Sequence, residues 1–363
     1  MRRCRLAGAS GRRRMRRRTD AHASQEGLMN PRVSLVVTCY NYGRFLGECL
    51  DSVVAQTLTD REAIVIDDAS TDETGEVLAK YRDVPGIRIV RHRERIGNIR
   101  SYNEGLDLAR GQYVAILSAD DYLLRPDGLE RQVAVFESDP DVGLVYSAHS
   151  IVQAGSPVRH VVPWPHAAVR PGAEEFRKLM WGNYILHSGA MLRREVEREL
   201  GPYDTELTHT GDWDMWLRAA ARHPVGYIAE PLYAYRIHGS NMFHRGLPPW
   251  RETDQVVTTV DRAFAALPPD APPDLLAASR AVRSHGFLQT PWWDLHHGRR
   301  GRTWRGFLYA LRRRPAIVLS GELWRFVPRL LLMTVVGREP YRRATGWLER
   351  LRRGAGPRRA WDN

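Results

Sequence analysis

A regular alternation of strand-like and helix-like segments near the N-terminus constrains the fold of this chain more than any other feature. Short apolar runs typical of buried strands occur at four places: 33–38, 63–66, 87–90 and 113–117. Segments with helical apolar spacing separate them, the first through Leu46, Cys49, Leu50 and Val53. This alternation predicts an α/β fold with a doubly wound, mostly parallel sheet, right-handed crossovers and helices on both faces.

Polar side chains follow three of these strands at the points where the strands end. Thr38 ends the first, Asp68 follows the second, and Asp120 and Asp121 follow the fourth. Ligands of such sheets bind beyond the carboxyl ends of the strands, so these side chains are expected at one edge. Adjacent carboxylates repel each other and are usually paired with a cation. An acidic turn could account for one pair of adjacent carboxylates. It accounts less well for polar residues at the ends of three strands.

The positive charge of the chain lies at its two ends. The net charge is +12, yet residues 1–28 carry nine Arg and residues 299–363 carry seventeen, which leaves the central body acidic. The first segment lacks periodicity and the apolar core of a secretory signal, so we expect it to be disordered. We also expect translation to start at Met29, just before the first strand.

Few cysteines and short apolar runs limit the compartment. Three cysteines without paired metal-type spacing predict a reducing, cytoplasmic environment. No uncharged apolar run reaches the length of about 18 residues that a membrane span needs, so no spanning helix is expected. The arginines lack the aromatic platform or recognised motif of a nucleic-acid-binding protein, so nucleic acid is not an expected partner.

Five motifs together resemble glycosyltransferase family 2, whose members have the GT-A fold and use nucleotide-diphospho-sugars. The motifs are VSLVVTCYNYGRFLGECLDSVVAQT, AIVIDDASTDET, GNIRSYNEGLDLARGQYVAILSADD, GDWDMWLR and YRIHGSN. The resemblance extends from Val33 to about Asn241. It implies a GT-A domain at 29–245, followed by a helical, basic region at 246–363.

The resemblance implies a donor site at the predicted sheet edge. Thr38 and Tyr40 would flank the nucleobase, and Asp68 would accept a hydrogen bond from it. Asp120 would lie near the ribose, and Asp121 would bind a divalent metal, Mg²⁺ or Mn²⁺, that bridges the two phosphates. Such a cation neutralises the charge that develops on the departing nucleoside diphosphate. A turn aromatic is the alternative for Tyr40.

Two further residues are expected at the diphosphate. The resemblance places His238 where it can reach the metal or the diphosphate, although an ordinary surface histidine is an equal alternative. Arg100 is the second candidate for the diphosphate. Its alternative is a simple helix pair with Glu104, four residues on.

Asp212 matches the aspartate of the family's Glu-Asp motif, which implies that it deprotonates the acceptor hydroxyl. Gly211 stands where the family commonly has Glu. Trp216 lies four residues after Asp212, so Asp212 has no local charge partner, whereas Asp214 is expected to form a surface pair with Arg218. A helix N-cap is the alternative role for Asp212.

The C-terminal region interleaves arginine with apolar and aromatic residues. Trp304, Phe307, Leu308 and Leu311 share one helical face, and a second apolar stretch runs from Trp324 to Met333 among arginines. This pattern is typical of a helix lying on an anionic membrane, here the inner face of the cell membrane. The alternative is a helix pair packed on the body with a solvated basic face.

The motifs favour an inverting, metal-dependent enzyme that moves one sugar from a UDP-sugar to an acceptor hydroxyl of a surface glycan or a lipid-linked acceptor. The alternative is a catalytically weak GT-A protein that binds nucleotide-sugars as a partner in a glycan assembly complex. Gly211 keeps this alternative open.

Overall fold

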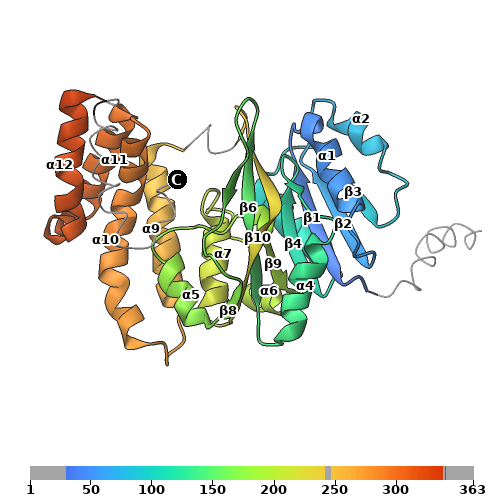
Figure 1. The fold of residues 1–363 in the computed structure, drawn as a ribbon. Helices are drawn as coiled ribbons and strands as arrows, with labels where there is room; N and C mark the ends of the chain where they lie inside the picture. The colour runs from blue at the N-terminus through green and yellow to red at the C-terminus, as the bar shows by residue number, and fades with distance from the viewer. Residues whose placement is uncertain (1–29, 242–246, 338–339, 341–363) are drawn as a thin grey trace, which may run out of the picture.

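The predicted strands form one sheet, which has ten strands in the part of the chain that the structure describes (Figure 1). The computed structural model describes residues 30–241, 247–337 and 340. The segment expected to be disordered, 1–28, lies outside these residues, as does the expected domain boundary near 245. The strands are β1 Val33–Cys39, β2 Arg61–Asp67, β3 Ile87–Arg91, β4 Tyr113–Ser118, β5 Tyr122–Leu123, β6 Leu144–Gln153, β7 Arg159–Val161, β8 Ala168–Arg170, β9 Ala190–Arg193 and β10 Val225–Ile237.

The strand order confirms the predicted doubly wound α/β sheet. The path is β3-β2-β1-β4-β9-β6-β10-β5, and its four longest pairings are parallel. β1 lies between β2 and β4, so the chain winds outward in both directions from it. In register, Thr38 lies beside Ser118 of β4, and Cys39 beside Asp67 of β2. The carboxyl end of β1 is therefore the switch point at which such sheets bind ligands.

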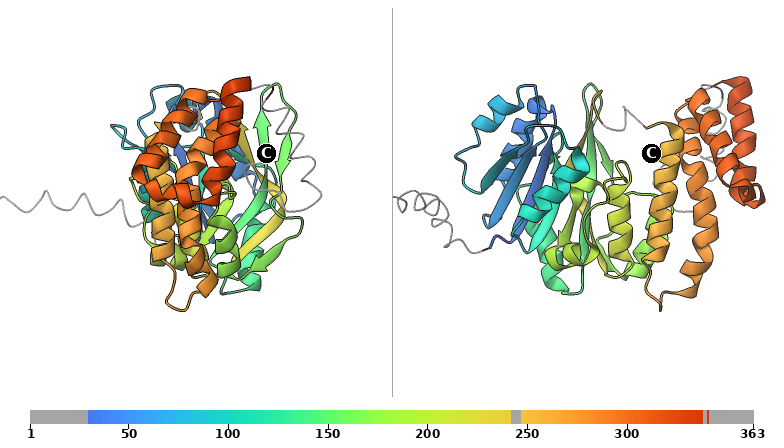
Figure 2. Two further views of the ribbon diagram at one scale, coloured as in Figure 1. Left: turned by 90° about the vertical axis from the view of Figure 1, so that its left-hand side faces the viewer. Right: turned by 180° about the vertical axis from the view of Figure 1, so that it is seen from behind.

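Helices cover both faces of the sheet (Figures 1 and 2). α1 Gly43–Val54, α2 Thr74–Ala79 and α4 Gly128–Ser138 lie over one face, where the predicted stripe of Leu46, Cys49, Leu50 and Val53 is buried. The other face carries α3 Asn98–Leu108, α5 Gly172–Leu179, α6 Arg194–Leu200 and α7 Gly211–Ala220. The core on this second face includes residues of the C-terminal helices α9 Pro249–Ala265 and α10 Pro273–His296 as well.

The second half of the sheet is less regular than the first. β10 is one strand whose register against β6 shifts on either side of Pro231. Proline cannot donate a ladder hydrogen bond, so a shift at this residue keeps the strand continuous. A short 3-10 helix, His187–Gly189, precedes β9.

The C-terminal region is helical as expected and packs onto the body. It consists of α9 Pro249–Ala265, α10 Pro273–His296, α11 Arg300–Arg313, the 3-10 helix Pro315–Leu319 and α12 Gly321–Val336. Phe307 of α11, on the face expected to meet a membrane, is buried in a cluster shared by α10, α11 and α12, while Leu308 is exposed. Within the described residues, no helix has both the length and the apolar character required to cross a bilayer.

Candidate functional site

The predicted sheet edge opens into a cavity of about 1570 Å³. Six of the eight predicted site residues line it: Thr38, Tyr40, Asp68, Asp120, Asp121 and Asp212. His238 does not line it but contacts Asp120. Arg100 is exposed and does not line the cavity, and its expected partner Glu104 instead contacts His92, with 2.6 Å between carboxylate oxygen and imidazole nitrogen. Arg95, on the loop before α3, lines the cavity where Arg100 was expected.

Asp68 fixes the loop that enters α3. Its carboxylate accepts hydrogen bonds from the backbone N–H of Ile96 at 2.7 Å and of Gly97 at 2.9 Å, and lies 2.9 Å from His92 Nδ1. Gly97 has a φ of +95°, which favours glycine. The loop places the Arg95 guanidinium 4.1 Å from the Tyr40 ring centre, so one face of this ring is covered and only the other is left for a base.

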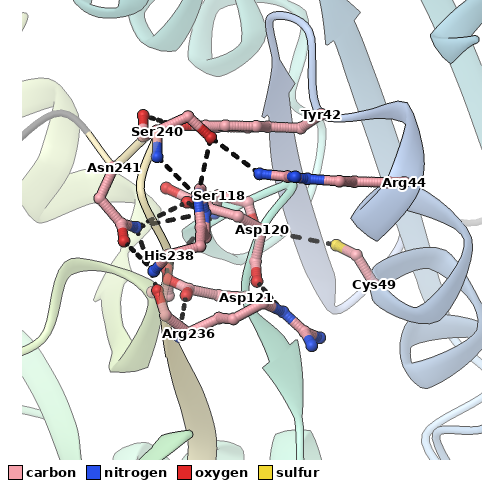
Figure 3. A network of polar contacts seen from close by, with 11 residues as sticks. Tyr42, Arg44, Cys49, Ser118, Asp120, Asp121, Arg236, His238, Ser240 and Asn241 are labelled. Carbon is pink, nitrogen blue, oxygen red and sulfur yellow. Dashed lines mark hydrogen bonds and ion pairs between the residues drawn. The ribbon is translucent and has the colours of Figure 1, made fainter. Parts of the chain in front are cut away.

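Asp120 forms the centre of a polar network with the loop that follows β10 (Figure 3). Its Oδ2 lies 3.0 Å from His238 Nε2 and accepts a hydrogen bond from Asn241 Nδ2 at 3.2 Å. His238 Nδ1 contacts Ser240 Oγ at 2.9 Å, which fixes the ring so that Nε2 faces the carboxylate. Ser240 in turn contacts α1, because Arg44 donates a hydrogen bond to its hydroxyl at 3.0 Å.

Asp121 is anchored away from His238. Its Oδ1 accepts the backbone N–H of Arg236 at 3.0 Å, and its Oδ2 accepts the Ser188 hydroxyl at 2.6 Å. Burial, and then the neighbouring charge of Asp120, hold the pKa of Asp121 well above its usual range. The two carboxylates therefore have different surroundings, and Asp120 is the one that His238 contacts.

The residues present are compatible with a divalent cation. The 3.0 Å between Asp120 Oδ2 and His238 Nε2 is the distance of a hydrogen bond or ion pair, and a cation held by both side chains would replace that contact. Among the described residues, no group of three or more His, Cys, Asp or Glu side chains is arranged as a metal site. Two protein ligands are enough for Mg²⁺ where substrate phosphates and water supply the rest.

Asp212 lies in the first turn of α7 and faces the same cavity. The helix begins at Gly211 with Thr210 as its N-cap, so Asp212 is not the N-cap residue. Its Oδ1 accepts the N–H of Trp213 and its Oδ2 the side-chain N–H of Asn183, each at 2.8 Å. Burial raises the pKa of Asp212 to about 6 although both hydrogen bonds oppose the shift. A carboxylate with a pKa near neutrality is suited to general-base chemistry.

The ion pair expected on the surface of α7 is buried. Asp214 does pair with Arg218 at 2.8 Å, but its side chain has no solvent exposure, and Arg262 of α9 lies 3.2 Å from its other oxygen. The expectation of a surface pair was wrong because α9 covers this side of α7. The pair therefore links the helix carrying Asp212 to the C-terminal helices.

Sequence reasoning missed three residues that shape the site: Arg95, Asn183 and Asn241. Asn241 lies within the YRIHGSN motif, so the motif was a signal for it. Arg95 is one of several arginines around residue 93. The spacing of the arginines in the sequence did not show that Arg95, and not Arg100, would line the cavity. Asn183 is 29 positions from its partner Asp212 in an irregular segment, where no periodic pattern could relate them.

Comparisons with known proteins agree with this fold. The model of glycosyl transferase family 2 matches residues 34–201. A PGL/p-HBAD biosynthesis glycosyltransferase of Mycobacterium bovis is 30% identical over 189 residues, which cover 52% of this chain and 69% of the relative. The chain spans only 30% and 22% of the length of two other curated relatives that it matches.

Two solved structures share the fold at low sequence identity. The structure of S. aureus TarS 1–349 in complex with UDP-GlcNAc has a TM-score of 0.57 at 15% identity, covering 79% of this chain and 92% of that one. The mannosyltransferase PcManGT from Pyrobaculum calidifontis, in complex with GDP-Man and Mn²⁺, has a TM-score of 0.53 at 21% identity, covering 88% and 84%. The motifs, the switch-point cavity and these matches together place the chain in glycosyl transferase family 2.

Proposed function

We propose that this protein is a glycosyltransferase that moves a single sugar from a nucleoside-diphospho-sugar to an acceptor hydroxyl, with inversion at the anomeric carbon. The observation that carries the proposal is that Asp120, at the switch point of the sheet, and Asp212, a carboxylate with a pKa of about 6, line one cavity. A donor diphosphate near Asp120 and an acceptor near Asp212 would meet between them.

The proposed donor is a UDP-sugar. Tyr40 offers one ring face for stacking on a base. Asp68 Oδ1 already meets the Ile96 N–H and His92 Nδ1, whereas Oδ2 retains a lone pair after accepting the Gly97 N–H. UDP-GlcNAc is the ligand in the TarS complex, and GDP-Man in that of PcManGT. Uracil and guanine both carry a ring N–H for such a carboxylate, so GDP-sugars belong in the same donor screen.

The proposed metal ligands are Asp120 and His238. This differs from the division expected from the sequence, in which Asp121 held the metal and Asp120 the ribose, because the oxygens of Asp121 already accept hydrogen bonds from Ser188 and Arg236. When bound, Mg²⁺ or Mn²⁺ would neutralise the negative charge that develops on the leaving diphosphate. Mn²⁺ accompanies GDP-Man in the PcManGT structure.

Asp212 would perform the proton transfer. Its carboxylate takes the proton of the acceptor hydroxyl as that oxygen attacks the anomeric carbon from the side opposite the diphosphate. The bond to the diphosphate oxygen breaks, its electron pair leaves with the nucleoside diphosphate, and one displacement inverts the configuration. Asn183 and the Trp213 N–H hold the carboxylate in place while its charge changes.

The alternative, a nucleotide-sugar-binding partner in a glycan assembly complex, rests on Gly211. A side chain at this position would begin 3.3 Å from Ile99 Cδ1, so the Glu common in the family would need Ile99 to move. This crowding explains why glycine suits the position here. It leaves Asp212, and with it the proposed base, unaffected.

Turnover of a nucleotide-sugar panel tests the proposed activity. With Mn²⁺ present, we expect slow hydrolysis of one donor by the full chain, and faster turnover when its acceptor is added. Asp212→Asn is expected to lose the acceptor-dependent turnover while keeping donor affinity. Binding of a nucleotide-sugar without any turnover, under all metal conditions, would favour the binding-partner alternative.

We also propose that the protein associates peripherally with an anionic membrane surface through the outer face of α12. Among the exposed large apolar residues that the structure describes, eight of fifteen lie between Leu308 and Val336. Trp324 is 67% exposed and Val335 82%, while Leu323 and Phe326 of the same helix are buried against α10 and α11. Arg325, next to Trp324, has 65% side-chain exposure and lines the cavity, so a cationic group borders the apolar face on its cavity side.

A further inference from the structure

The cavity continues past Asp212 toward the C-terminal helices. Its far part is lined by the hairpin of β6 and β7, by α5 and the loop after it, and by α10 and α12. Figures 1 and 2 show the C-terminal helices beside α5 and α7. Typical pockets for one small ligand measure about 300 to 1,000 Å³, so a cavity of about 1570 Å³ has room for a second ligand. We call this far part the acceptor compartment; the residues that define it here are Arg159, Trp164, Lys178, Trp181, Tyr184, His285, Glu322 and Arg325.

The loop after α5 joins this compartment to the proposed base. Asn183 donates its hydrogen bond to Asp212, and Trp181, two residues earlier, packs edge-on against His285 of α10 with ring centres 5.5 Å apart. The compartment therefore begins at Asp212, on the side away from Asp120. A molecule bound there would present a hydroxyl to Asp212 while the donor occupies the switch point.

Aromatic side chains with fixed orientation form one side of the compartment. Trp164 and Tyr184 lie edge to face, with ring centres 5.8 Å apart and planes at 87°. The Tyr184 hydroxyl donates to buried Glu175 at 2.6 Å, and Trp164 Nε1 donates to the Tyr146 hydroxyl at 2.9 Å. Half-buried rings held by such bonds lose little freedom on binding, and suit a saccharide, which has apolar C–H faces and polar edges.

Cationic side chains dominate the charge of the compartment. Among the described residues, Arg159, Arg177, Lys178 and Arg325 line it, and beyond Asp212 the one carboxylate there is that of Glu322. Arg325 lies 3.5 Å from Glu322 and is largely exposed, so this pair contributes little stability and a ligand anion replaces it at small cost. Lys178 is half-buried, pairs with Glu174 and lies 4.4 Å from the Trp164 ring centre. Within the described residues, Arg159 has no ion-pair partner.

We propose that the acceptor compartment binds a saccharide that carries an anionic oxygen group, a phosphate ester or a carboxylate. This inference rests on the proposed glycosyl transfer and names the class of its acceptor. The rings of Trp164, Trp181 and Tyr184 contact the sugar, and Arg159 and Arg325 contact the anion. The C-terminal helices are thus a wall of the acceptor site through His285, Glu322 and Arg325.

Tryptophan fluorescence of the full chain tests the compartment, with the donor site filled by Mg²⁺ and saturating nucleoside diphosphate. The probes are glucose, glucose 6-phosphate, glucuronic acid and inorganic phosphate. We expect at least one anionic sugar to bind tenfold or more tightly than both glucose and phosphate, and to weaken with salt. The preferred anionic sugar distinguishes a phosphorylated acceptor from a uronic acid acceptor.

A pair of charge-reversal variants, one in the compartment and one elsewhere, tests the role of the arginines. The double variant Arg159→Glu/Arg325→Glu is expected to lose the preference for the anionic sugar, whereas Arg305→Glu/Arg312→Glu, on the exposed surface of α11, retains it. The proposal is overturned by equal binding of glucose, by equal binding of phosphate alone, by an unchanged preference in the first variant, or by no binding up to about 10 mM. Donor turnover by the unmodified protein reports on the proposed activity separately, so the two can fail independently.

Discussion

At the scale of single residues, the chemistry depends on how differently the three carboxylates of the cavity are held. Asp120 faces an imidazole, Asp121 accepts hydrogen bonds from Ser188 and a backbone N–H, and Asp212 lies in surroundings that disfavour its charge. In the proposed mechanism, the same functional group serves metal binding, structural support and proton transfer.

The pKa of Asp212 predicts the acid limb of the rate profile. The base must be ionised, and burial raises its pKa to about 6, so kcat is expected to be constant above pH 7 and to fall tenfold per pH unit well below 6. Asp212→Asn is expected to lower kcat by about 10²–10⁴ without lowering the midpoint of thermal unfolding at pH 8. Burial disfavours the ionised carboxylate in the folded state, so Asp212 lowers the free energy of unfolding increasingly as pH rises through its folded pKa. The Asn side chain has no charge and removes this destabilisation. A profile flat down to pH 5 would contradict the assignment.

Asn183 is expected to position Asp212 and to favour its ionised form. Asn183→Leu removes the 2.8 Å hydrogen bond with little change in volume, so the acid limb should move to higher pH and kcat at pH 6.5 should fall about tenfold. Asn183→Gln is expected to restore part of the loss. In an Asp212→Asn background the Asn183→Leu change should have little further effect on kcat, and independent, additive losses would argue against coupling of the pair.

Metal affinity separates the two adjacent carboxylates. Asp120→Asn is expected to weaken Mn²⁺ binding more than tenfold in the presence of nucleoside diphosphate, because it removes the proposed ligand beside His238. Asp121→Asn should weaken it less, since the Asp121 oxygens accept bonds from Ser188 and Arg236. Isothermal titration calorimetry compares the variants; the reverse ranking would return the metal to Asp121.

Chelation by EDTA should abolish turnover, and added Mn²⁺ should restore it.

At the scale of elements, the close packing of α3 on β1 sets the position of the switch point. A Cβ added at Gly105 of α3 would lie 2.2 Å from Val36 Cγ1 in β1. Gly105→Ala is therefore expected to destabilise the protein by about 1–3 kcal/mol, despite the better helix propensity of alanine. Gly47→Ala in α1 is the control, because its nearest neighbour would be 3.9 Å away, and it should stabilise by up to about 1 kcal/mol. Denaturant unfolding measures both; equal effects would mean that the packing is not tight.

The elements predicted from sequence are those with a strong local pattern. The strands around Val36 and Ile116 and the apolar stripe of α1 follow from the spacing of apolar residues, because each strand is buried on both faces and α1 buries one side. The link between Asp212 and Asn183 and the burial of Asp214 could not be predicted, because they depend on how distant segments pack.

At the scale of the whole molecule, the outer face of α12 predicts reversible membrane binding. Vesicles of phosphatidylglycerol and phosphatidylcholine are expected to carry the protein in flotation, and Trp324→Ser/Leu331→Ser/Val335→Ser should reduce the bound fraction about tenfold or more. The matched control, Val169→Ser/Leu276→Ser, removes similarly exposed residues elsewhere. Binding should weaken at high salt as the arginine contribution is screened. Flotation unchanged by the triple variant would exclude this face.

The placement of the C-terminal helices has a further consequence for how specificity can change in the family. The proposed donor residues follow β1, β2 and β4, whereas His285, Glu322 and Arg325 reach the same cavity from α10 and α12. Arg262 of α9 meets Asp214, two residues from the proposed base, so these helices dock on the helix that carries Asp212. Recombination that exchanged the segment for α9 to α12 would thus alter one wall of the proposed acceptor compartment, and would leave the proposed donor residues and the wall formed by β7 and α5 unchanged.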